Sequence, residues 1–253
     1  LVLTCFEKAK NQINGALHYD TRQGVGLIAN YTGRNILGYS SRLLIGMDIA
    51  EQPKFRIEYQ QNIGETKKWW WRGQIYGQKS KQSYYVYGNI GEELKSSFLK
   101  SNIQFNRDFN PLLQYFGVDI NYEHNKTKPK LDPSVNNNIY DLRRYTSDNL
   151  EIGVHYAHNG MEKVFFPEKG TRFKGRISRS VIHHINVQYD EAINDNEAGS
   201  TNGFTKVSFE FEKRLPFKNM FSFIINAATG LTFIDKELSS KISFVENGKG
   251  AQY

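Results

Sequence analysis

The sequence predicts an all-β fold of antiparallel strands, and three observations carry that prediction. Apolar and polar residues alternate with a period of two over most of the 253 residues, as in strands with one apolar and one polar face. No segment shows helical periodicity with capping residues, and no run of about 18 apolar residues could form a membrane-spanning helix. Short turn sequences alternate with longer polar stretches, which is typical of the two rims of a transmembrane β-barrel.

About twelve strands of roughly 8–14 residues each can be placed along the chain. The alternating segments lie around residues 43–49, 55–59, 69–75, 102–106, 116–123, 150–156, 173–181, 206–212 and 221–233. The clearest is 206–212, in which Val207, Phe209 and Phe211 share one face and charged residues occupy much of the other. Turn sequences lie near residues 21, 34, 51 and 109. The polar stretches 124–138 and 190–203 lack apolar periodicity, and we expect both to be surface loops.

Two kinds of protein fit this alternation. In a soluble β-sandwich the apolar faces form the core, whereas in a transmembrane barrel they contact lipid and the polar faces line a wet lumen. The mean hydropathy of −0.60 and the net charge of +7 allow either, since a barrel alternates and its average is unremarkable. Aromatic residues near strand ends favour the barrel, because such residues form girdles at both membrane interfaces. The predicted girdle residues are Tyr59, Trp69, Trp71, Tyr122 and Tyr156.

Three stretches resemble a known family. The segment FFPEKGTRFKGRISRS (165–180), with Phe166, Pro167, Gly170 and Arg172, resembles the signature of the outer-membrane barrel superfamily that includes BamA, TamA and the two-partner-secretion transporters. The segment 204–233 resembles the next strand pair of those barrels. The segment 16–59, with Asn35 and Gly38 in its N-x-T-x-R-N-x-L-G piece, is most similar to the barrel of bacterial patatin-like proteins.

The resemblance implies a 16-stranded antiparallel transmembrane barrel, of which about 12 strands are present here. Residues 1–10 would end a periplasmic POTRA-like module, and residues 11–253 would form the barrel, with its C-terminal strands apparently missing. The implied location is the bacterial outer membrane, and the implied role is to anchor, and to help export or present, an upstream patatin-like lipase domain. The implied partners are outer-membrane lipid and lipopolysaccharide, the upstream POTRA and patatin-like domains, and the machinery that assembles outer-membrane proteins; homo-oligomerisation stays open.

Two alternatives remain. One is a BamA-type pore for protein insertion or secretion, and the other is a soluble β-rich module that binds carbohydrate or nucleic acid. We expect no nucleic-acid partner, because the basic run from Arg172 to Arg179 lacks a recognisable binding module and fits a lumen lining better. Arg179 is the one charged residue on the apolar face of that run. We expect it to lie near a rim, where a charge on the lipid face costs little.

We expect no catalytic, cofactor or metal site in this chain. A patatin-type lipase needs a nucleophile in G-x-S-x-G, which does not occur, so any such chemistry would lie upstream. Adjacent His183 and His184 face opposite sides of a strand and cannot chelate one metal ion together. In the WWW run, Trp69 and Trp71 should face one way and Trp70 the other.

Overall fold

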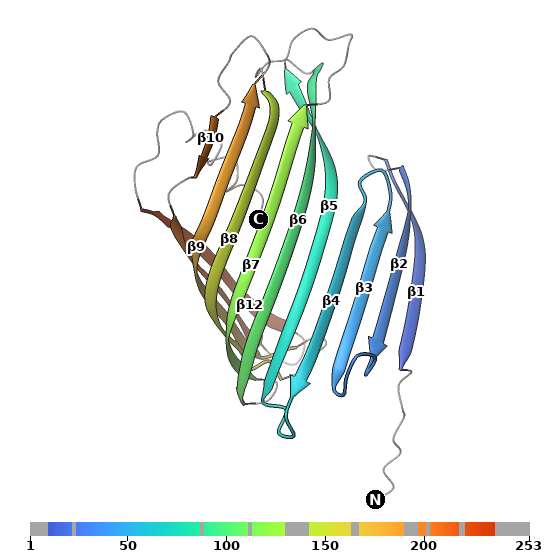
Figure 1. The fold of residues 1–253 in the computed structure, drawn as a ribbon. Helices are drawn as coiled ribbons and strands as arrows, with labels where there is room; N and C mark the ends of the chain where they lie inside the picture. The colour runs from blue at the N-terminus through green and yellow to red at the C-terminus, as the bar shows by residue number, and fades with distance from the viewer. Residues whose placement is uncertain are drawn as a thin grey trace, which may run out of the picture.

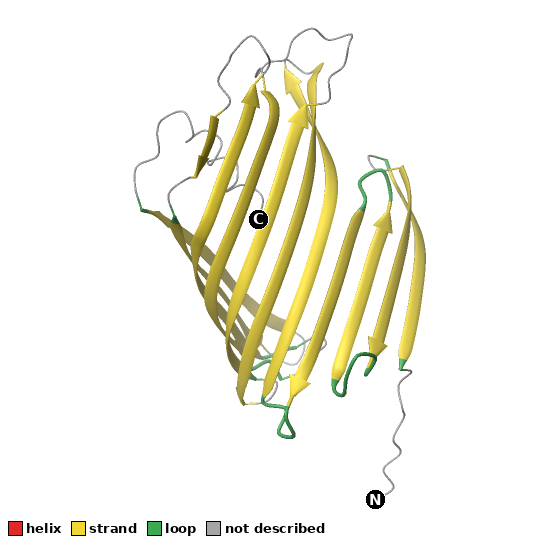
Figure 2. Ribbon diagram, viewed as in Figure 1, coloured by secondary structure: helices red, strands yellow, loops and turns green. Residues whose placement is uncertain are grey.

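The computed structural model describes residues 10–21, 24–86, 89–110, 113–129, 142–162, 167–189, 197–200, 203–217 and 221–235. These residues form twelve strands and no helix (Figures 1 and 2). The strands are β1 (Asn11–Asp20), β2 (Gly24–Arg34), β3 (Ser41–Ile49), β4 (Lys54–Ile63), β5 (Trp69–Val86), β6 (Asn89–Asn110), β7 (Gln114–Pro129), β8 (Leu142–Asn159), β9 (Gly170–Tyr189), β10 (Glu197–Ser200), β11 (Phe204–Phe217) and β12 (Phe221–Ile234).

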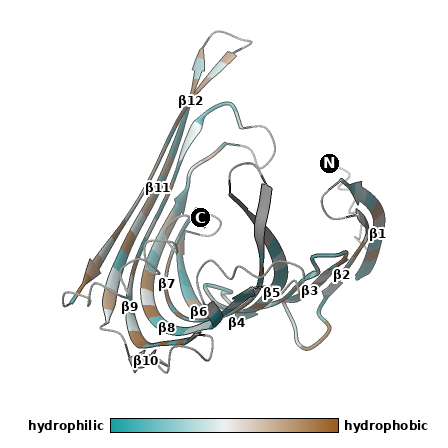
Figure 3. Ribbon diagram, turned by 90° about the horizontal axis from the view of Figure 1, so that it is seen from above, coloured by the Kyte–Doolittle hydropathy of each residue, from teal (hydrophilic) through white to brown (hydrophobic). Residues whose placement is uncertain are grey.

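All strands belong to one antiparallel sheet in which neighbours in sequence are neighbours in space. The order runs from β1 to β9 and then through β11 to β12, while the short β10 pairs with β9. Viewed from above, the sheet curves around an interior, as the wall of a barrel does, and β1 and β12 are the two ends of its strand order (Figure 3). The predicted all-β antiparallel barrel fold is confirmed.

The connections divide between two rims. Strands β7 and β9 end, and β8 begins, at the rim that is uppermost in Figure 1. We call it the long-loop end, because the long sequence intervals 130–141 and 190–196 follow β7 and β9. The opposite rim carries the connections 35–40 and 64–68 and the end of β6, and we call it the short-turn end.

Burial is reversed relative to a soluble protein. Among the described residues twelve polar side chains are buried, including Asp119 and Glu151, but only six apolar ones. Large apolar side chains on the opposite parity are instead exposed, among them Ile103, Val118 and Phe209. The polar residues therefore line the concave side of the sheet, and the apolar residues form its outer face.

The strands differ from the sequence-based expectation in length. Strands β5 to β9 contain 16–22 residues rather than 8–14. Strand β7 continues to Pro129, so the loop expected to start at residue 124 begins later, and the expected loop 190–203 contains β10. Both errors have one cause. Outside an apolar environment a strand keeps its backbone pairing while both of its faces become polar, so the alternation that marks it disappears.

A bulge in β9 also changes which residues face inward. Leu150 pairs with Ile182 and Glu151 with Ser180, which leaves Val181 as an extra residue. Both Val181 and Ile182 are therefore exposed, and the inward parity moves to His183. As predicted, His183 and His184 face opposite sides, with His183 buried and His184 exposed.

Candidate functional site

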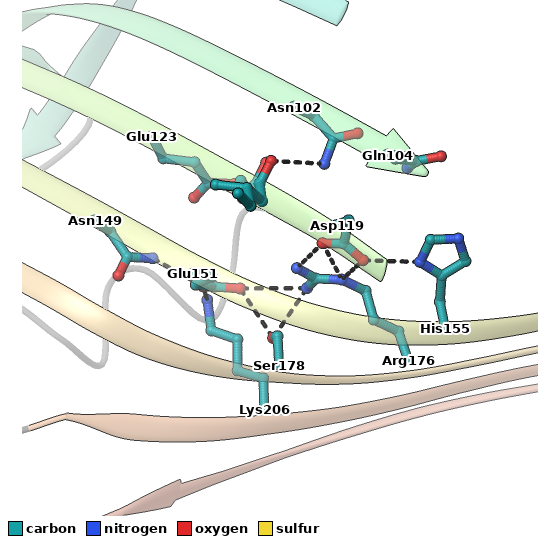
Figure 4. Close-up of polar contacts among 12 residues, drawn as sticks. Asn102, Gln104, Asp119, Glu123, Asn149, Glu151, His155, Arg176, Ser178 and Lys206 are labelled. Atoms are coloured by element: carbon teal, nitrogen blue, oxygen red, sulfur yellow. Dashed lines mark hydrogen bonds and ion pairs between the residues drawn. The ribbon is translucent and has the colours of Figure 1, made fainter. Parts of the chain in front are cut away.

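The most elaborate polar arrangement in the described part of the chain lies on the concave side of β7, β8, β9 and β11. We call it the inner-wall cluster, and its members are Asp119, Glu151, His155, Arg176, Ser178 and Lys206. Figure 4 shows these side chains converging from neighbouring strands. Each lies at an inward position of its strand, so the cluster follows from the alternation and from the register between strands.

Arg176 is the centre of the cluster. Its Nη2 and Nε donate to the carboxylate of Asp119 at 2.7 and 3.1 Å, and its Nη1 donates to Glu151 Oε2 at 3.2 Å (Figure 4). The side chains of Asp119 and Glu151 are almost completely buried, at 1% and 2% exposure. One guanidinium thus bridges two buried carboxylates from different strands, and such charge-assisted bonds are among the strongest that a protein forms.

Glycines on β7 and β8, which have no side chain, leave the space for this reach. Gly153 lies on β8 between Asp119 on β7 and Ser178 on β9. A Cβ atom at Gly153 would lie 3.1 Å from Arg176 Nε and 3.1 Å from Asp119 Oδ1. The guanidinium therefore crosses β8 through the space above this glycine. Gly117 on β7 plays the same part for His155, whose Nε2 comes within 2.7 Å of Asn106 on β6.

Glu151 is saturated with partners. Lys206 Nζ on β11 donates to its Oε1 at 2.9 Å, and Ser178 Oγ donates to its Oε2 at 3.0 Å. Asn149 Nδ2 donates to Oε1 at 2.8 Å. A buried carboxylate is tolerated only when it is paired and hydrogen-bonded, which is the case here.

The contacts of the cluster are suited to bracing the wall. Two carboxylates meet two permanent cations, and His155 Nδ1 contacts Asp119 Oδ2 at 2.8 Å. The hydroxyl of Ser178 is taken up by Arg176 and Glu151, so it is not positioned beside a histidine base. In the described residues no group of three or more His, Cys, Asp or Glu side chains could hold a metal ion. The contacts tie β7, β8, β9 and β11 together across the concave face.

Two further histidines have partners outside this cluster. His158 Nδ1 lies 3.1 Å from Gln114 Nε2, and the ring of His183 meets Phe204 edge-on with a centroid separation of 5.3 Å.

Residues 170–180 of the 165–180 stretch form the half of β9 nearer the short-turn end, and residues 167–169 precede the strand. Phe166 lies outside the described residues. Gly170 has a φ of 132°, and a Cβ there would lie 2.5 Å from the carbonyl oxygen of Gly160, so the position requires glycine. The carbonyl oxygen of Pro167 accepts a bond from Arg214 Nη1 at 2.9 Å. Arg172 pairs with Glu212 on β11, so this stretch ties the turn before β9 to β11.

The basic residues of the same stretch are divided between the two faces of β9, as the alternation predicts. Lys174 and Arg176 extend on the concave side toward carboxylates, with Lys174 Nζ 3.8 Å from Glu210. Arg179 lies on the outer parity, and its Nη1 donates to Asp235 Oδ1 at 2.7 Å just beyond the end of β12. Arg179 itself lies midway along β9, opposite Ile152 on β8 and Thr205 at the start of β11, so it is near a strand end only on its β11 side. Its position near a rim stays a prediction.

Asn35 and Gly38 shape the connection from β2 to β3. Asn35 has a φ of 53°, and its Oδ1 accepts a bond from the backbone N–H of Ser41 at 3.3 Å. The carbonyl oxygen of Gly38 accepts a bond from Ser41 Oγ at 2.6 Å. Asn35 and Gly38, which carry part of the family resemblance, therefore both stabilise the turn between β2 and β3.

The predicted girdle residues lie on the outer parity of their strands. The ring of Trp69 stacks on Phe105 at 5.2 Å, and Tyr59 contacts Trp71 at 5.1 Å, both near the short-turn end. Tyr122 lies farther toward the other rim and donates to Asp148 Oδ1 at 2.6 Å. Trp70 faces the opposite way, is buried, and donates to Asp108 at 2.8 Å.

Tyr156 on β8 lies in the same cross-strand row as Trp69, with Arg107 and Phe116 between them, and its ring lies 5.5 Å from that of Phe173. Whether these aromatic residues meet lipid stays a prediction.

The sequence pattern does not identify the inner-wall cluster. In the sequence, Asp119 and Glu151 are only polar members of alternating segments, and Arg176 is only part of a basic run. The alternation predicts that these residues face inward. It does not predict which inward residue of one strand lies opposite which residue of another strand.

Comparisons with known proteins support the fold. No family model matches the sequence, and no curated protein matches it. Among solved structures the chain is similar to the crystal structure of BamA from Haemophilus ducreyi lacking POTRA domains 1–3, with a TM-score of 0.54 and 14% identity. The match covers 90% of this chain and 41% of that chain. The chain therefore has the fold of a BamA-type β-barrel wall and spans about two fifths of that chain's length.

Proposed function

We propose that this chain is the membrane-embedded barrel domain of a bacterial outer-membrane protein, and that the barrel anchors a patatin-like lipase domain encoded upstream of Leu1. The observation that carries the membrane part is the reversal of burial, with charged residues such as Asp119 inside and residues such as Ile103 and Phe209 outside. Soluble monomers rarely expose a contiguous apolar patch larger than a few hundred Å². In lipid the same outer face is satisfied, because the bilayer core is as apolar as the side chains.

The anchoring part rests on the resemblance of the segment 16–59 to the barrels of patatin-like proteins. The inner-wall cluster is in accord with a non-catalytic barrel, since its carboxylates are held by Arg176 and Lys206. In this proposal the lipase chemistry resides upstream, and the barrel keeps the enzyme at the membrane that holds its lipid substrate and helps to export or present it. The partners would be outer-membrane lipid, lipopolysaccharide, the upstream POTRA and patatin-like domains, and the assembly machinery that inserts the barrel.

A BamA-type insertion or secretion pore is the second candidate, and the similarity of the fold to BamA favours it. The two candidates differ in what precedes Leu1. A single POTRA module after a domain with G-x-S-x-G supports the lipase anchor, whereas several tandem POTRA modules and no such motif support the pore.

Membrane fractionation of the full-length protein tests the membrane part. We expect it in the outer-membrane fraction after carbonate washing, soluble only in detergent, with a folded form that migrates differently from the boiled form on a gel. A folded, monomeric protein in water without detergent would refute the membrane proposal and favour the soluble β-rich module. Replacing the serine of an upstream G-x-S-x-G should abolish phospholipid hydrolysis while leaving the barrel folded; unchanged hydrolysis would refute the lipase part.

A further inference from the structure

On the outer face of β5 to β8 the side chains change abruptly from apolar to basic toward the long-loop end. The cross-strand row Ile75, Ser101, Tyr122 and Leu150 belongs to the apolar band. Two rows farther on, Lys79 pairs with Ser97, which pairs with Lys126. In the next row Lys81 pairs with Lys95, which pairs with Lys128. Arg144 lies beside this row, two residues beyond the partner of Lys126. We call these residues the outer basic patch: Lys79, Lys81, Lys95, Lys126, Lys128 and Arg144.

The row of three lysines is unfavourable on its own. Directly opposed residues of an antiparallel pair have Cβ atoms about 5 Å apart, and like charges in such pairs destabilise the sheet. Lys95 faces a lysine on both sides, on β5 and on β7. A sheet that carries such a row gains stability when a multivalent anion lies across it.

Among the described residues, carboxylates pair with the patch at one edge. Lys81 pairs with Glu51. Glu93 adds attraction at the same edge. Within the described ranges, Lys79, Lys95, Lys126, Lys128 and Arg144 make no ion pair with a carboxylate. Asp148, one row below, is bound by Tyr122 and His124.

The patch also lies where headgroups would lie. It faces outward, as the apolar band does, and follows that band within a few residues on each strand. In bacterial outer-membrane barrels the longer loops are extracellular, so this end would meet the outer leaflet. Lysine stems can lie along apolar surface while their amines reach phosphate groups at the membrane boundary.

We propose that the outer basic patch binds the phosphate groups of the phosphorylated glycolipid, lipopolysaccharide, in the outer leaflet. The proposal rests on the membrane location proposed above. The glycolipid's phosphates would bridge Lys95 to Lys126 and Lys128 and remove the repulsion along the row. The protein would then recruit this lipid as a specific annular partner on the β5–β8 side of the barrel.

The test uses the full-length protein in nanodiscs of zwitterionic phosphocholine lipid, titrated with bis-phosphorylated lipid A. The variant is Lys95→Gln/Lys126→Gln/Lys128→Gln, and the matched control Lys10→Gln/Lys68→Gln/Lys213→Gln removes the same charge from exposed lysines toward the short-turn end. Each basic residue near an anionic lipid surface strengthens binding several-fold, so the patch variant should bind at least about tenfold more weakly and the control within about twofold of the parent. Dephosphorylated lipid A should lose affinity to a similar extent.

The outcomes separate the two proposals. A parent protein that fails to enter any bilayer or nanodisc overturns the membrane proposal itself. A parent protein that inserts but binds phosphorylated and dephosphorylated lipid A equally, or a patch variant that binds like the control, overturns the patch alone. Competition by inorganic phosphate or by duplex DNA at the same concentration as lipid A would assign the patch to a free anion or to nucleic acid, and would also overturn the proposal.

Discussion

Removing Arg176 should destabilise the barrel far more than removing a neighbouring cation. The substitution Arg176→Met deletes the guanidinium that bridges Asp119 and Glu151, whose side chains are 1% and 2% exposed. Deleting one partner of a buried ion pair costs about 3–5 kcal/mol. The Arg176 side chain is 30% exposed, and Glu151 keeps Lys206 at 2.9 Å, so we expect a loss of about 2–3 kcal/mol in the free energy of unfolding.

The matched control is Lys174→Met, two residues away on the same strand and the same face. Its ion pair with Glu210 is long, at 3.8 Å, and both side chains are more than half exposed. Exposed pairs contribute about 0–1 kcal/mol, so this variant should unfold almost as the parent does. Urea unfolding of protein refolded in lipid vesicles, followed by tryptophan fluorescence, measures both variants under one condition.

A double-mutant cycle adds a second, independent check. When Asp119→Asn removes the unpaired charge, Arg176→Met should cost at least about 1 kcal/mol less than it does alone, because the residues are in direct contact. Equal losses for Arg176→Met and Lys174→Met, or strict additivity with Asp119→Asn, would show that the guanidinium does not brace the wall.

Three further predictions use the same unfolding assay. Phe209→Arg places a charge on the outer face, which contacts lipid in the proposed membrane location, and should cost about 2–4 kcal/mol, whereas Glu210→Arg on the opposite face should cost much less; equal effects would mean that the two faces have been confused. Gly153→Val should cost about 1–3 kcal/mol because it fills the space through which the guanidinium passes. Gly230→Val, where a Cβ would meet nothing within 4 Å, should be tolerated, and similar losses for both valines would contradict this explanation. Gly170→Ala should cost about 1–3 kcal/mol, since its φ of 132° suits only glycine; a neutral effect would show that the turn relaxes freely.

The existence of the strands and the two faces of each strand are predictable to a large extent. Alternation in the 206–212 segment is enough to separate the exposed Phe209 from the inward Glu212. Strand ends are less predictable, as the extension of β7 to Pro129 shows, because polar residues on both faces leave no periodic signal. The bulge at Val181 is also unpredictable, since one extra residue changes no composition and only shifts the parity of the later residues of β9.

The sequence by itself determined the fold class and the side on which each residue of a regular strand lies, because a period of two is a property of neighbouring residues. Only the tertiary structure decided which residues meet. Arg176 reaches Asp119 across 57 positions of sequence, and Lys95 stands between Lys81 and Lys128, because of the register of β5 through β9. That register is set jointly by backbone hydrogen bonds, turns and bulges along the whole sheet, and a slip of one residue would turn every side chain to the other face. Both the inner-wall cluster and the outer basic patch are therefore products of register.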